Sequence, residues 1–142
     1  MHKYFNPRKF LSITNKILPL SALCFVIFIS SGLYYALFNS PADYQQGDSV
    51  RIMYVHVPAA WMALGVYSFI GIVSIARLTW KNPFSDVIAI SAAPIGAGFT
   101  IICLATGALW GKPIWGTWWV WDARLTSVPV SYTHLRAHET RP

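Results

Sequence analysis

Charged side chains are scarce in this chain. Asp, Glu, Lys and Arg make up 11% of its 142 residues, whereas 55% of the residues are hydrophobic. Soluble globular domains carry roughly 25% charged residues, so the composition excludes an ordinary soluble domain and indicates a membrane protein. The net charge is +6, but the basic residues do not form one patch, because several precede the first apolar run. This distribution is typical of membrane topology and argues against nucleic-acid binding.

Cysteine is scarce as well. Only Cys24 and Cys103 occur, and neither belongs to a C-x-x-C or C-x-x-C-H motif. The sequence therefore excludes a thioredoxin-like oxidoreductase and covalent attachment of haem by this chain itself. Both cysteines lie inside apolar runs, where we interpret them as small buried hydrophobic residues.

Long hydrophobic runs, in contrast, dominate the sequence. They cover residues 17–38, 57–78 and 87–109, and each matches the roughly 20 residues that a helix needs to cross a bilayer. The first run has the basic flank of a signal peptide, but it is longer than the roughly 7–15-residue core of such peptides. We therefore predict an all-α integral membrane helix bundle in which all three runs are transmembrane helices.

The positions of Lys and Arg predict how these helices are oriented. The segment before the first run carries Lys3, Arg8, Lys9 and Lys16. Loop 79–86 carries Lys81, whereas the longer loop 39–56 carries Arg51 beside two aspartates. The positive-inside rule then predicts a cytoplasmic N-terminus. Loop 39–56 and the residues after 109 are expected on the external face, which is the periplasmic face if the source is a Gram-negative bacterium.

Five of the seven tryptophans lie just after the third run. An aromatic belt at the membrane interface accounts for one or two tryptophans at a helix end, but poorly for five. We therefore predict that residues 110–124, called the tryptophan segment below, form an aromatic surface for a planar ligand.

The backbone of this segment has two possible conformations, although Gly111, Pro113 and Gly116 weaken a continuous helix. If the segment is helical, one face carries Trp115, Trp118, Trp119 and Asp122. If it is extended, one face carries Trp115, Thr117, Trp119 and Trp121.

His56 lies at the outer end of the second run, on the same predicted side as the tryptophan segment. A histidine at a helix end is often only an interfacial polar residue, but beside an aromatic surface we favour axial ligation of iron.

These residues resemble a known family. The stretch Trp115–Asp122, WGTWWVWD, is similar to the signature of the tryptophan-rich (WWD) haem-handling proteins of cytochrome c biogenesis, and Tyr54–Met62 around His56 fits the same family. Within it the chain most resembles the haem exporters, in which the signature follows the third of six helices. The resemblance covers most of residues 10–127 and implies that the three runs are three of an expected six helices.

The resemblance also implies a function. The protein would be a multi-pass protein of the bacterial inner (plasma) membrane. It would bind haem b non-covalently at the external, periplasmic face and deliver it to the periplasmic haem chaperone (CcmE), without being an enzyme. A small membrane subunit (CcmD) and ABC transporter subunits would be further partners, and nucleic acid would not.

The resemblance also implies the site residues. His56 would be the first axial ligand and the metal ligand of this chain, while the second family histidine lies outside these residues. The haem-contact residues would be Trp115, Trp118, Trp119, Trp121 and Asp122, together with Arg124. Arg124 is the candidate for holding the propionates of the porphyrin, and the alternative for it is an ion pair with Asp122 or with a lipid phosphate.

Residues 128–142 are polar and basic without an apolar period and resemble a translated read-through tail. We therefore expect residues 1–127 to be the N-terminal half of a polytopic haem-handling membrane domain, and we assign no role to His134 or His138. Two other functions are possible: a quinone- or haem-binding subunit of a membrane redox complex, or a scaffold subunit of a transporter. Redox subunits usually ligate haem with histidines inside the spans, and the three spans lack histidine.

Overall fold

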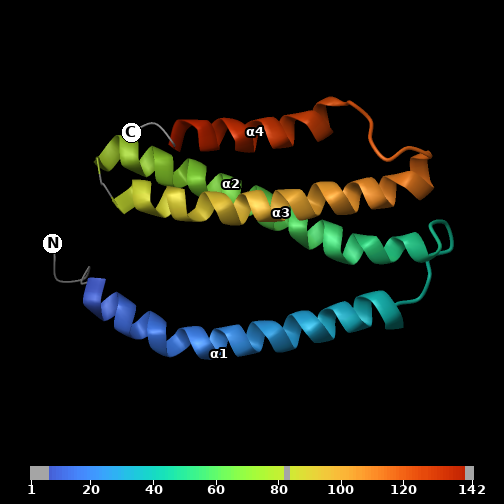
Figure 1. Ribbon diagram of the computed structural model, residues 1–142, viewed down its shortest axis with the longest axis horizontal. Helices are drawn as coiled ribbons and strands as arrows, with labels where there is room; N and C mark the ends of the chain where they lie inside the picture. Colours follow the sequence, from blue (N-terminus) through green and yellow to red (C-terminus); the bar gives the residue numbers. More distant parts are fainter. Residues whose placement is uncertain (1–6, 82–83, 140–142) are drawn as a thin grey trace. The chain divides into compact units, whose positions relative to one another are not determined.

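The computed structural model describes residues 7–81 and 84–139, and nearly all of this part of the chain is helical (Figure 1). Three helices are long and apolar enough to cross a membrane, namely Leu11–Asn39, Asp48–Trp80 and Phe84–Trp115. The prediction of an all-α membrane protein with three spans is therefore confirmed. The chain divides into two units, Met1–Ser40 and Pro41–Pro142, which are described separately.

The first unit is one long helix. Helix α1 (Pro7–Tyr34) continues into a single π-helical turn, η1 (Tyr35–Asn39). Its large apolar side chains are exposed, as Phe28 illustrates with 72% of its surface accessible. Its serine hydroxyls donate back to carbonyls of the preceding turn, for example Ser31 Oγ to the Ile27 carbonyl at 2.8 Å. Polar groups that are satisfied within the helix make α1 compatible with an apolar bilayer.

The second unit is built on an antiparallel helical hairpin. A 3₁₀ turn, η2 (Asp48–Ile52), leads directly into α2 (Met53–Trp80), and α3 (Phe84–Trp115) returns beside it (Figure 1). Helix α2 ends at Trp80. The next residue, Lys81, adopts φ 49° and donates its N–H to the Arg77 carbonyl at 2.9 Å. An ion pair of 3.0 Å between Arg77 and Asp86 joins the ends of α2 and α3.

Small residues dominate the buried positions of this hairpin. In α2 the buried residues are Ala59, Ala63 and Ile70, while Gly96 and Thr100 are among those of α3. Small side chains let two helix backbones approach closely, as is common between membrane helices. Close packing brings the first turns of α2 and the last turns of α3 together at the same end of the hairpin.

Helix α3 extends to Trp115, beyond the apolar run that ends at residue 109. Gly111 and Pro113 were expected to weaken the helix, but α3 passes through both. Gly111 is buried, and a membrane helix tolerates the missing N–H donor of a proline. It stops at Gly116, whose φ of +76° and N–H bond to the Lys112 carbonyl (3.0 Å) form a left-handed helix end. The tryptophan segment is therefore helical up to Trp115 and non-helical after it.

The chain then turns back through an irregular stretch into α4 (Ala123–Glu139), which contacts α3 (Figure 1). Asp122 caps this helix, since its Oδ1 accepts the N–H of Leu125 at 2.8 Å. Helix α4 crosses the predicted boundary at Ser127 without a break, although the sequence there shows no apolar period. The described part of α4 does not belong to the three candidate spans, and the proposed tail stays a prediction.

Candidate functional site

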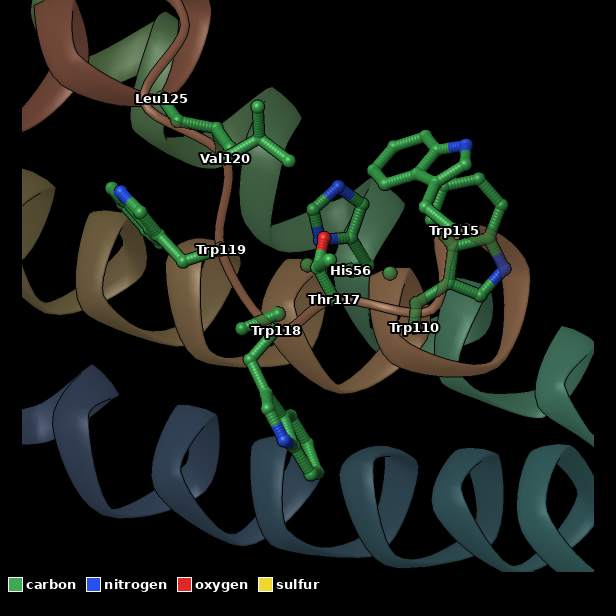
Figure 2. A pocket seen from close by; sticks show the side chains of 11 residues that line it. His56, Trp110, Trp115, Thr117, Trp118, Trp119, Val120 and Leu125 are labelled. Atoms are coloured by element: carbon green, nitrogen blue, oxygen red, sulfur yellow. The ribbon is translucent and has the colours of Figure 1, made fainter.

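A pocket lies at the end of the hairpin where α2 begins and α3 ends (Figure 2). It encloses about 110 Å³. Its wall combines one imidazole with aromatic rings of the tryptophan segment: His56, Trp110, Trp115, Trp118 and Trp119. Residues from both helices and from the irregular stretch therefore meet around one apolar space.

His56 is half-buried in the first turn of α2 and packs against α3. Its Nδ1 lies 3.0 Å from Thr106 Oγ1 and 3.9 Å from Cys103 Sγ. A Cβ on Gly107 would lie 3.1 Å from His56 Cε1, so the imidazole rests directly on the bare backbone of α3. Figure 2 shows a ring nitrogen of His56 pointing away from α3, toward the space between Trp115 and Val120. Because Nδ1 faces Thr106, this nitrogen is Nε2.

The aromatic rings of the tryptophan segment stand at steep angles to one another. Trp110 and Trp115 meet edge to face, with centroids 5.3 Å apart and planes at 77°. Trp119 and Trp121 meet in the same way, at 5.8 Å and 73°. Indoles that pack on one another prefer this geometry, so the rings form upright walls around a space. Trp110 is held further by a 3.1 Å bond from its Nε1 to Gln46 Oε1 in the loop before α2.

Lys112 holds the turn between the two parts of the tryptophan segment. Its Nζ donates to the Gly116 carbonyl at 2.9 Å and lies 5.8 Å from the centroid of the Trp118 ring. Both contacts fix the path of the chain as it leaves α3. Nearby, the indole nitrogen of Trp119 is buried and has no hydrogen-bond partner among the described residues.

The structure brings together four of the seven predicted site residues, namely His56, Trp115, Trp118 and Trp119. Trp121 does not line the pocket; it is 84% exposed and contacts Trp119. Asp122 lies at the start of α4, where it acts as a cap. The side chain of Arg124 lies outside the part of the chain that the structure describes.

Three residues at the site carry no signal in the sequence. Thr106 and Gly107 lie in an apolar run, where both are compatible with an ordinary membrane helix. Gln46 lies in a polar loop and has no motif around it. Their importance comes from contacts between helices and loops 50 to 64 residues apart in the chain, which a periodic pattern does not encode. Trp110 differs from these three, since it belongs to the conspicuous tryptophan cluster.

Several known proteins are similar to this chain in sequence. A family model described as "Heme exporter protein C" matches residues 1–133. This chain belongs to the heme exporter protein C family. Relatives that carry this name include proteins from Bradyrhizobium diazoefficiens (50% identical) and Escherichia coli (43% identical), each aligned over 127 residues, or 89% of this chain. A ccmC-like mitochondrial protein of cytochrome c biosynthesis from Marchantia polymorpha is 51% identical over 100 residues, which are 70% of this chain and 44% of that protein.

Membership of the heme exporter protein C family, together with the three candidate spans, makes this a multi-pass membrane protein. The chain spans about half the length of the curated relatives, 48% for the Bradyrhizobium protein and 52% for the Escherichia coli protein.

Proposed function

We propose that this chain binds haem at the external face of the bacterial inner membrane and passes it to a periplasmic chaperone during cytochrome c maturation. Haem is then a cargo and the chain is not an enzyme. The names of the relatives support this proposal, because they describe heme export and, for the Marchantia polymorpha protein, cytochrome c biosynthesis.

The observation that carries the proposal is the position of His56. Its Nε2 points into a pocket whose other walls are mainly tryptophan rings (Figure 2). A neutral imidazole nitrogen is a good ligand for haem iron, and indole rings pack well against an apolar macrocycle. An imidazole and aromatic walls around one space are what binding of an iron porphyrin requires.

The size and the donors of the pocket fit one edge of a porphyrin. Sites that enclose a whole cofactor-sized ligand measure roughly 300–1,000 Å³, and this pocket encloses about 110 Å³. Among the described residues, no three His, Cys, Asp or Glu side chains cluster as a metal site. In haem the porphyrin already supplies other ligands to the iron, so a single imidazole from this chain suits haem. We propose that the second axial histidine lies in the other half of the family fold.

The rim of the same ligand carries anionic propionates. The buried Trp119 indole N–H has no acceptor among the described residues, but because this nitrogen is inaccessible we assign it no contact with the ligand. Arg124 stays the proposed partner of the propionates. Trp121 and Asp122 stay in the proposed contact set, Trp121 as an exposed ring and Asp122 as the residue that fixes the start of α4.

Orientation and partners complete the proposal. The excess of Lys and Arg before the first apolar run supports a cytoplasmic N-terminus, and with this orientation we propose that the pocket faces the periplasm. There the haem chaperone CcmE would receive the cargo. CcmD and the ABC transporter subunits would be neighbours in the membrane.

The test is a haem titration of the purified chain in detergent micelles, followed by absorbance. We expect His56→Ala to weaken haem binding at least tenfold, or about 1.4 kcal/mol. The matched control is His134→Ala, which removes a histidine to which the sequence gives no role, and it is expected to bind haem like the wild type. Equal binding by the wild type and His56→Ala would overturn the proposal and favour a redox or scaffold subunit.

A further inference from the structure

We infer that Thr106 is a positioning residue for His56: it keeps the imidazole proton on Nδ1 and so presents an unprotonated Nε2 to the pocket. This inference rests on the proposed function for its purpose, because the unprotonated nitrogen is the one that ligates iron. The protonation of the imidazole itself is a property of the chain without haem.

The hydroxyl of Thr106 has one proton, and the helix already uses it. Thr106 Oγ1 lies 2.7 Å from the Ile102 carbonyl and 3.2 Å from the Cys103 carbonyl, both in the preceding turn of α3. The shorter distance is typical of a hydroxyl that donates to an oxygen, and such back-bonding is common for threonine in helices. Toward His56 the hydroxyl oxygen is therefore an acceptor.

An acceptor at that position fixes the proton on the imidazole. The Nδ1–Oγ1 distance of 3.0 Å equals the usual separation of an N–H donor and an oxygen acceptor. If the proton were on Nε2, two lone pairs would face each other across this contact, or Thr106 would have to give up its bond to Ile102. Both alternatives cost a hydrogen bond in an apolar helix interface, where an unmade bond is expensive.

Gly107 fixes the position of the same ring by shape. A Cβ there would meet His56 Cε1 at 3.1 Å and Nδ1 at 3.6 Å, so an added methyl group requires the ring to shift. Two adjacent residues of α3 therefore act on the imidazole. Thr106 determines which ring nitrogen carries the proton, and Gly107 allows the ring to lie close to the helix backbone. Cys103 Sγ also faces Nδ1, but at 3.9 Å the sulfur is a weaker competitor than the hydroxyl oxygen.

The experiment is nitrogen NMR of the haem-free chain with ¹⁵N-labelled histidine in detergent micelles, with the His56 signals assigned by their loss in His56→Ala. We expect wild-type His56 to carry its proton on Nδ1, Thr106→Ser to keep it there, and Thr106→Val to move it largely to Nε2. Cys103→Ala is the control for the second neighbour and is expected to leave the proton on Nδ1. A wild-type proton on Nε2, or no change in Thr106→Val, would overturn the inference.

Haem titration of the same variants separates this inference from the proposed function. We expect Thr106→Val to weaken haem binding by 10–100-fold, as is usual for residues that orient a metal ligand, and Thr106→Ser to restore it. Gly107→Ala should weaken binding as well, whereas Gly98→Ala, on the same helix with open space around its Cβ, should not. Suppose that the Thr106 variants change the position of the imidazole proton as expected, but neither the wild type nor any variant binds haem. The positioning role then stands and the proposed function fails.

Discussion

The two parts of the tryptophan segment, which divide at Gly116, hold their rings in different ways. Before it, Trp110 and Trp115 belong to α3 and contact each other edge to face, and Trp110 is tied to the loop before α2 through Gln46. After it, the chain is irregular and ends on the most exposed ring, Trp121 at 84%, whereas Trp118 at 56% is as open as Trp115 at 57%. Regular backbone thus fixes the wall beside His56, while irregular backbone forms the opposite wall.

This difference indicates a division of work. A helix positions side chains rigidly, which suits the wall next to an iron ligand, since a metal ligand needs a defined position. An irregular stretch adapts more readily, which suits the side through which a bulky ligand enters and leaves. One fixed wall and one adaptable wall are an appropriate combination for the proposed function, in which the chain hands on its haem.

The largest effect is expected from removing one ring on each side of Gly116. Trp115→Ala opens the fixed wall, and we expect haem affinity in a titration to fall about tenfold, or 1.4 kcal/mol. Trp121→Ala removes an exposed ring, and its loss is expected to be only about two- to threefold. Equal losses, or a larger loss for Trp121→Ala, would contradict the division between the two parts.

The next effect concerns the boundary itself. Gly116 has φ +76°, a conformation that costs an L-residue about 1–2 kcal/mol, so Gly116→Ala should lower the free energy of unfolding by that amount. Gly98→Ala is the control, because it adds the same methyl group inside α3 where nothing lies within 4 Å. Thermal unfolding in micelles, followed by circular dichroism, measures both, and equal midpoints would show that the boundary is not strained.

A smaller effect is expected for the tie between Gln46 and Trp110. Gln46→Ala removes the acceptor of the Trp110 indole N–H, which should cost about 1 kcal/mol and move the tryptophan fluorescence. Gln45→Ala is the neighbouring control, since Gln45 is exposed and bonds to Asp43 through its backbone. If both variants behave alike, the first part of the segment is fixed by α3 alone.

The smallest effect is expected for Lys112. Lys112→Met removes a bond to the Gly116 carbonyl and a cation over Trp118, and an exposed contact of the latter kind contributes about 0.5–1 kcal/mol. We expect faster quenching of tryptophan fluorescence by acrylamide, because the second part of the segment loosens. Lys9→Met, in α1, should quench like the wild type, and the same rate in Lys112→Met would remove Lys112 from the account.

The sequence alone was sufficient to predict the elements of this fold that depend only on local properties of the chain. Three apolar runs of bilayer length predict three helices, because length and hydropathy decide whether a helix can cross a membrane. The end of α3 could not be predicted in the same way. Gly111 and Pro113 are helix-weakening residues by themselves, but α3 continues through both. In the same turns Trp110 bonds to Gln46, 64 residues away in the chain, and local helix preferences do not include such a tertiary contact.

Some features of the candidate site could likewise be predicted from the sequence, and others could not. Tryptophan clustering and a histidine at the matching membrane depth point to the pocket, because composition and topology are visible in one dimension. The contacts of His56 with Thr106 and Gly107 are not, since they depend on which face of α2 meets which face of α3. The steep angles between the rings also follow from packing, and the sequence did not predict them.

The central claim is that His56 ligates the iron of haem in this pocket. Its most direct test is the resonance Raman spectrum of haem bound to His56→Gly, recorded with and without added imidazole and compared with the wild type. The account predicts that the iron–histidine signal of the wild type is lost in His56→Gly and returns when imidazole fills the space. A spectrum of His56→Gly that matches the wild type without imidazole would contradict it.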